Sequence, residues 1–242
     1  MTKQINLVLN GKGGVGKSFF ATNFVQYLKD RCLVHRALDT DHENSTLKRF
    51  HPEAGFVNIE DKRCLDELFT AAETSDLLVI DGRAASTDLF LDYFAEVVLS
   101  EVLVTLKARL TIICPINHEA DSIEQLRLVS EHLGPRCRYV VVRSQAHSES
   151  FDLYDDSKLR NVLRDQFGAE EVTMPRLHDW LVMALNRHNV TVTGALQHPA
   201  FHFLDRQRLK HWQNRFYEQV DTVADSLLPP AGAPTELAAS PA

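Results

Sequence analysis

The chain alternates between short apolar runs and longer stretches in which apolar residues recur at helical spacing. In the first run, Ile5, Leu7 and Leu9 fall on alternate positions, as in a strand with one buried face. Strands joined by helices connect through right-handed crossovers, which give a parallel sheet covered on both faces. The pattern predicts an α/β fold, a three-layer sandwich on a mainly parallel, twisted sheet. The expected strands cover residues 5–9, 33–39, 77–81, 110–115, 138–143 and 171–175.

The stretches between these runs predict helices that pack against the sheet. In the first, Phe20, Phe24 and Leu28 lie on one helical face. Charged residues interrupt the apolar stretch 89–106, which predicts one or two packed helices and not a membrane span. We predict one domain over residues 1–228 and a disordered, Pro- and Ala-rich tail over 229–242. The remaining expected helices are a short one closing over 48–52 and longer ones at 64–72, 119–133, 157–167 and 202–228.

A complete phosphate-binding loop separates the first expected strand from the first helix. Its glycines Gly11 and Gly16 allow the backbone to fold around phosphates, Lys17 neutralises their charge, and the Ser18 hydroxyl can hold Mg²⁺. The loop amides and the positive end of the following helix point at the same anion. We therefore predict ATP and Mg²⁺ as cofactors, a P-loop NTPase sandwich, and loop contacts to the nucleotide that also include Gly13, Gly14 and Val15.

Acidic residues stand where two further expected strands end. Asp39 and Asp41 follow the second strand, and Asp81 ends the apolar run 77–80. The carboxyl ends of parallel strands meet at one edge of the sheet, so these carboxylates should face the same mouth as the phosphate loop. An acid that ends a buried strand beside such a loop is typical of a Mg²⁺ ligand, and we assign that role to Asp81.

Composition argues against several other kinds of protein. Cys32, Cys64, Cys114 and Cys137 lie far apart without the C-x-x-C spacing of zinc or iron–sulfur sites. The sequence has no run of 18 apolar residues and no signal-peptide pattern at its start, so we expect a cytoplasmic protein without a transmembrane segment.

The formal net charge of −7 argues against a protein that is basic throughout but permits a local basic face. Positive side chains gather in the first half of the expected helix 202–228. They could contact DNA phosphates non-specifically, or they could form an ordinary solvated helix face. These residues are Arg206, Arg208, Lys210 and Arg215.

The loop has one lysine more than phosphate binding requires, namely Lys12. With it, the sequence KGGVGKS resembles the deviant Walker A motif of the ParA/MinD superfamily. The resemblance implies that Lys12 reaches across a dimer interface to the partner's nucleotide. It also implies that Asp39 and Asp41 contact the Mg²⁺ shell and orient the attacking water, with Asp41 the first candidate for the water and Asp39 the second. The alternative is a strand-end loop whose acids are solvated. The chain departs from the family pattern at His42-Glu43-Asn44 and at Gly82-Arg83, which follow these acids.

The same resemblance implies base contacts near the last expected strand, from Met174, Pro175 and Arg176. Arg143 stands where some relatives carry an asparagine. The implied function is an ATP-dependent homodimerisation switch whose slow hydrolysis is stimulated by a partner protein. Small relatives of this kind, including TraL-like and StbB-like proteins, serve plasmid maintenance, partition or conjugative transfer. Two other functions stay open, a dethiobiotin-synthetase-like ligase and a metal or cluster carrier ATPase.

Overall fold

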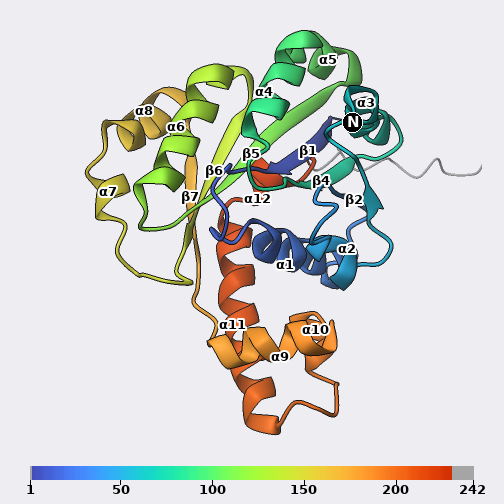
Figure 1. The fold of residues 1–242 in the computed structure, drawn as a ribbon, viewed down its shortest axis with the longest axis vertical. Coiled ribbons are helices and arrows are strands. Elements are labelled where there is room, and N and C mark those ends of the chain that lie inside the picture. The colour runs from blue at the N-terminus through green and yellow to red at the C-terminus, as the bar shows by residue number, and fades with distance from the viewer. Residues whose placement is uncertain (1, 231–242) are drawn as a thin grey trace, which may run out of the picture.

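The fold is built on a seven-stranded sheet in which every strand pair is parallel. The computed structural model describes residues 2–230. The strand order is β3-β2-β4-β1-β5-β6-β7, so β1 lies at the centre between β4 and β5 (Figure 1). The strands are β1 Lys3–Val8, β2 Arg36–Asp39, β3 Gly55–Phe56, β4 Leu77–Asp81, β5 Ala108–Ile116, β6 Arg138–Ser144 and β7 Glu170–Met174.

Helices cover both faces of this sheet, which confirms the predicted three-layer sandwich (Figure 1). On one side, Ile5 and Leu7 of β1 belong to a core cluster with buried residues of five helices. These are α3 Lys62–Glu73, α4 Thr87–Glu96, α5 Leu99–Leu106, α6 Ala120–Leu133 and α8 Lys158–Phe167. On the other side, Val8 packs with residues of α1 Lys17–Asp30, α2 Thr46–Phe50, α9 Asp179–His188, α10 Val192–Ala195, α11 Phe203–Thr222 and α12 Ala224–Leu227. Two short helical segments, η1 Gly134–Arg136 and α7 Asp152–Asp155, complete the described part.

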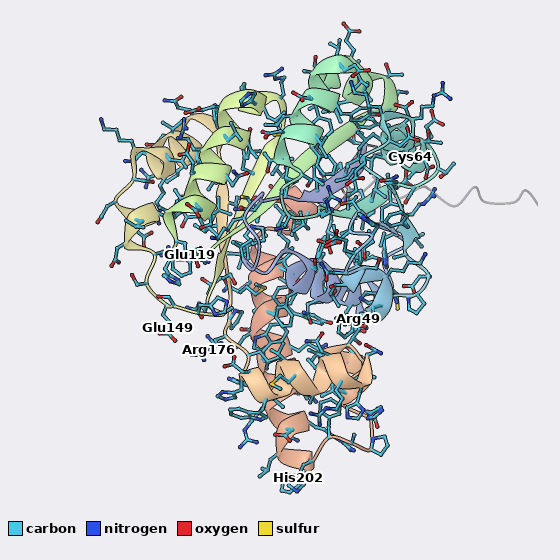
Figure 2. All side chains as sticks on the ribbon, in the orientation of Figure 1. Arg49, Cys64, Glu119, Glu149, Arg176 and His202 are labelled. Atoms are coloured by element: carbon cyan, nitrogen blue, oxygen red, sulfur yellow. The ribbon has the colours of Figure 1, made fainter. Side chains whose placement is uncertain are left out.

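The C-terminal helices have two different surroundings. The second half of α11 lies under the sheet, where Trp212 and Phe216 stack with ring centroids 5.4 Å apart and Phe216 meets Phe20 of α1. The first half extends away from the sheet together with α9 and α10 (Figure 1). Figure 2 shows His202, just before α11, at the end of the molecule farthest from the sheet. The described part of the chain is therefore a sheet domain with a helical extension at residues 176–215.

Predicted and observed boundaries mostly differ by at most two residues, with two exceptions. The second strand begins at Arg36 and not at residue 33. The expected long helix 202–228 is interrupted, since α11 ends at Thr222 and α12 begins at Ala224. The predicted domain ends at residue 228, and of the predicted disordered tail all but Pro229 and Pro230 lies outside the described residues. Among residues 2–230 no helix has the length and apolar character needed to span a membrane.

Candidate nucleotide-binding site

The predicted phosphate loop connects β1 to α1 at the carboxyl edge of the sheet. Its backbone adopts conformations that favour glycine, with φ of 78° at Gly14 and 97° at Gly16. A Cβ atom at Gly16 would also lie 2.7 Å from Cε of Met174, so the loop packs closely against the end of β7. These two constraints explain why glycine occupies the position at which the loop turns into α1.

Lys17 lies inside this loop and is almost fully buried, with 6% of its surface exposed. Its Nζ donates a hydrogen bond to the backbone carbonyl of Lys12 at 2.8 Å. Burial lowers the pKa of Lys17, and the charge of Asp81 acts in the opposite direction. The loop thus holds an ammonium group where little water reaches it, an arrangement that favours an anionic ligand.

Asp81 ends β4, the strand that pairs with β1 and with β2. Its carboxylate is buried, and neither oxygen has a hydrogen-bond partner among the described residues. Burial, together with the charge of Asp39, raises the pKa of Asp81 to about 8, while Ser18 comes close enough to lower it without reaching hydrogen-bonding geometry. A buried carboxylate with both oxygens unpartnered beside a phosphate loop fits a Mg²⁺ ligand.

Asp39 and Asp41 lie at the neighbouring strand end, where both organise the local backbone. Asp39 accepts hydrogen bonds from the backbone N–H of Asp41 at 2.9 Å and of Lys48 at 3.0 Å. Burial raises the pKa of Asp39. Burial would also raise the pKa of Asp41, but hydrogen bonds from Asn44 and Glu43 outweigh it and lower that pKa. Asp41 therefore carries a charge at the mouth of the site.

One hydroxyl joins the segments that follow β2 and β4. Thr40 Oγ1 donates to the backbone carbonyl of Asp81 at 2.8 Å and accepts from the backbone N–H of Arg83 at 2.9 Å. The Arg83 guanidinium forms an ion pair with Glu60 at 2.9 Å. In this structure the side chain of Arg83 thus contacts a carboxylate.

Lys12 projects from the loop toward the start of α6. Its Nζ lies 2.8 Å from Glu119 and 3.2 Å from Asp121, and these two carboxylates raise its pKa. Both pairs are partly exposed to solvent. Lys12 is therefore paired within its own chain, a contact that the sequence analysis did not anticipate.

A cavity of about 400 Å³ opens beside the loop, between α1, α2 and α9. Of the three predicted base contacts, Met174 and Pro175 line it, whereas the Arg176 side chain is 54% exposed and pairs with Asp179 at 3.6 Å. Arg49 of α2, labelled in Figure 2, donates to Asn186 of α9 at 2.8 Å and so connects two walls of the cavity. The lining residues that the sequence analysis missed include Phe19, Ala146, His147 and Leu177.

Comparison with known proteins gives relatives of both sequence and fold. No family model matches the chain. The protein MobD of Acidithiobacillus ferrooxidans is 27% identical over 220 residues, which cover 88% of this chain and 95% of that protein. A TraL protein of Escherichia coli is 26% identical over 244 residues, covering 91% and 98%. The septum site-determining protein MinD of Pyrococcus horikoshii, solved with Mg-ADP, matches with a TM-score of 0.54 and 14% identity over 93% of this chain and 98% of that one.

The chain has the ParA/MinD-like P-loop ATPase fold. It is also distantly homologous to MobD and to plasmid TraL proteins. Both statements agree with the resemblance first seen in the KGGVGKS loop.

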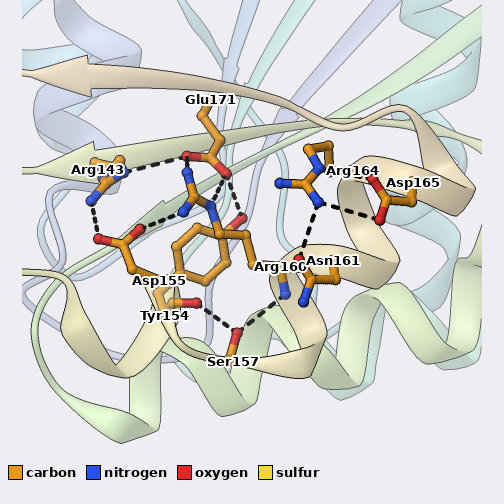
Figure 3. A network of polar contacts seen from close by, with 9 residues as sticks. All are labelled: Arg143, Tyr154, Asp155, Ser157, Arg160, Asn161, Arg164, Asp165 and Glu171. Atoms are coloured by element: carbon orange, nitrogen blue, oxygen red, sulfur yellow. Dashed lines mark hydrogen bonds and ion pairs between the residues drawn. The ribbon is translucent and has the colours of Figure 1, made fainter.

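In this ParA/MinD-like chain, Arg143 does not point to the cavity. It forms ion pairs with Asp155 at 2.6 Å and with Glu171 at 3.4 Å, and Arg160 binds Glu171 from the other side at 2.7 Å (Figure 3). The Arg143 guanidinium also lies 4.8 Å from the centre of the Phe151 ring. This network ties β6 and β7 to α7 and α8, and so it anchors the segment after β6 that supplies Ala146 and His147 to the cavity.

Proposed function

We propose that the protein binds ATP with Mg²⁺ at the phosphate loop and acts as a nucleotide-dependent dimerisation switch. The observation that carries this proposal is that a buried lysine, Lys17, and a buried carboxylate without a hydrogen-bond partner, Asp81, lie at one loop. Lys17 and the amides of Gly13, Gly14, Val15 and Gly16 hold the phosphates. Ser18 and Asp81 hold the metal, with Asp39 beside them, and Mg²⁺ supplies neutralisation of the phosphate charge.

The cavity beside the loop supports a position for the adenine base. Phe19 follows Ser18 directly, and Met174 and Pro175 lie in the same wall. Apolar walls next to a phosphate site suit a planar base, because stacking and burial of the base increase the affinity without requiring a charged partner. Arg176 then serves through its backbone, since its side chain is turned toward Asp179.

We propose that hydrolysis is slow and depends on how the attacking water is positioned. Asp41 stays charged at the mouth of the site and orients the attacking water. A partner protein that reorders this segment stimulates the reaction. Among residues 2–230, no group of three or more His, Cys, Asp or Glu side chains is placed to hold a metal ion by itself.

The nucleotide site is tested by removing the charge of Lys17. We expect Lys17→Ala to abolish ATP binding in calorimetry with Mg²⁺, because the β and γ phosphates lose their buried cation. Lys62→Ala removes an exposed lysine of α3 that pairs with Glu96, and it should bind as the unchanged protein does. ATP affinity in Lys17→Ala equal to that of this control would disprove the site.

Dimerisation is tested at Lys12. In this proposal Lys12 exchanges its partners Glu119 and Asp121 for the nucleotide of the second subunit. Two facing nucleotides bring several negative charges together in a poorly solvated interface, so the loss of a cation there is costly. Lys12→Ala should still bind ATP but should neither dimerise nor hydrolyse it normally.

Light scattering with size-exclusion chromatography measures this on a hydrolysis-slow Asp41→Ala background with ATP. Lys62→Ala on the same background is the matched control and should dimerise. If the Lys12→Ala protein dimerises to the same extent as its parent, Lys12 has no role across the interface.

A plasmid setting is proposed from the homology to MobD and TraL, as a role in maintenance, partition or conjugative transfer. The helical extension supports DNA contact, since residues 176–215 hold six arginines or lysines and two acids in a chain of net charge −7. Among the four candidates, Arg206 turns inward to the His198 carbonyl, whereas Arg208, Lys210 and Arg215 are exposed. An Arg208→Glu, Arg215→Glu variant should lose salt-sensitive, ATP-linked DNA binding. Binding equal to that of the unchanged protein would leave this face as a solvated surface.

A further inference from the structure

A second hollow lies at the opposite edge of the sheet from the phosphate loop. It has a volume of about 470 Å³ and lies between the end of α5, the first residues of β5 and β6, and η1. The amino ends of parallel strands face away from their carboxyl ends, so this hollow is separate from the nucleotide site. We call it the basic groove, and its lining residues include Lys107, Arg109, Arg136 and Arg138.

These four side chains concentrate positive charge without ion-pair partners. Within residues 2–230, none of the four lies within 4 Å of a carboxylate oxygen. The Nε atom of Arg109 is buried and has no hydrogen-bond partner in that part of the chain. Burial and the charge of Arg138 lower the pKa of Arg109, and the charge of Asp225 acts in the opposite direction. The groove is thus a place where positive charges repel one another in an acidic protein.

A structural role accounts for part of this arrangement. Arg109 Nη2 donates to the Leu228 carbonyl and Arg138 Nη1 to the Asp225 carbonyl, both at 2.9 Å, so these arginines hold the end of α12. A guanidinium has five N–H donors, and each of these bonds uses one of them. Arg136 likewise donates to the carbonyls of His132 and Leu133 at the end of α6, which uses two of its five donors. The exposed Lys107 ammonium makes no such hydrogen bond among residues 2–230.

The floor of the groove is apolar. Leu103, Leu110 and Cys137 line it and are buried, and Val104 stands at its margin with 78% of its surface exposed. An apolar floor with a cationic rim suits a ligand that combines carboxylates with aliphatic side chains.

We infer that the basic groove binds a short acidic segment of a partner protein, one in which glutamate or aspartate alternates with aliphatic residues. A nucleic acid fits less well, because a phosphate backbone would leave the apolar floor uncovered. A short peptide senses mainly the charges within about one Debye length, roughly 8 Å, which here are positive.

This inference does not depend on the proposed function. A partner in the basic groove leaves the phosphate loop and Lys12 free, because they lie at the other edge of the sheet. The protein could hold this partner in either nucleotide state, so peptide binding should be unchanged in Lys17→Ala.

Fluorescence anisotropy tests the proposal with a labelled peptide of alternating glutamate and leucine. We expect binding that weakens as salt rises from about 50 to about 300 mM. Lys107→Gln with Arg136→Gln should weaken the affinity about fivefold to tenfold, since both charges lie at the groove. The matched control is Lys62→Gln with Arg164→Gln, which removes two exposed charges elsewhere and should leave the affinity within about twofold.

Three outcomes would overturn the proposal. The unchanged protein could fail to bind the peptide, or both double variants could lose affinity equally, which would indicate a general charge effect. A DNA duplex or phosphatidylserine vesicles could instead bind more tightly than the peptide and lose binding in the groove variant, which would make the groove a phosphate site. Equal thermal unfolding midpoints of the two double variants ensure that the comparison concerns folded proteins.

Discussion

Gly82 follows Asp81 directly, and its substitution by alanine gives a sharp test of how β4 supports the site. Its backbone N–H donates to the Val8 carbonyl at 2.9 Å. A Cβ atom on Gly82 would lie 2.6 Å from that same oxygen and 3.3 Å from Cδ1 of Leu9. The oxygen belongs to the central strand and cannot move away alone, so β1 and β4 must separate at this point.

The expected loss has two parts. Forcing an extra carbon against fixed backbone costs about 1–3 kcal/mol. Weakening the Gly82-to-Val8 hydrogen bond costs about 1 kcal/mol more. Gly82→Ala should therefore lower the free energy of unfolding by about 2–4 kcal/mol. It should also weaken ATP binding, because Val8 and Leu9 lead directly into the phosphate loop.

Urea denaturation and calorimetry with Mg-ATP measure the two effects. Gly194→Ala is the matched control, since its Cβ would meet Thr191 and Val190 at ordinary distances of 3.5 Å. That change should alter the unfolding free energy by less than about 1 kcal/mol. If Gly82→Ala were as stable as Gly194→Ala, the close approach of β1 and β4 described here would be wrong.

Three further predictions concern charged side chains. Burial lowers the pKa of His51, so below about pH 6.5 the unfolded chain binds a proton at this residue more readily than the folded chain does. The free energy of unfolding, measured by urea denaturation, should therefore decrease as the pH falls below that value. The decrease should be smaller in His51→Gln. Glu171→Gln should lower the free energy of unfolding by about 1–3 kcal/mol, because Arg143 and Arg160 each lose one carboxylate partner. An unchanged midpoint in urea denaturation would contradict this. Glu119→Gln with Asp121→Asn frees Lys12 and should raise the ATP-dependent dimer fraction about threefold in light scattering, whereas a fall would show that these acids assist dimerisation.

The sheet was predictable because its strands are buried on both faces. Runs such as 77–80 are apolar throughout, and the observed β4 has the predicted bounds. The two-residue strand β3 is too short to carry a periodic pattern. Helix α9 was not predicted, because its apolar residues 180–185 are consecutive and do not show helical spacing.

Site residues were predictable where a single physical requirement selects the residue type at a position. The glycines of the phosphate loop and the burial of Asp81 follow from backbone geometry and from the strand pattern. The contacts of Lys12 with Glu119 and of Arg83 with Glu60 join residues far apart in the chain, so no spacing rule could reveal them. The cavity wall formed by Phe19 was equally hidden, because a helix pattern does not show which exposed position faces a neighbouring helix.

The hydrogen bonds of the Thr40 hydroxyl couple the movements of two segments at the site. The hydroxyl holds the last residue of β4, Asp81, and the backbone of Arg83 after it, while the Thr40 backbone follows Asp39, the last residue of β2. A displacement of either segment must break or carry along these two hydrogen bonds. We therefore expect the segments after β2 and β4 to change conformation together in a single step. The surface that they form for a partner protein would then have two conformations and no populated intermediate.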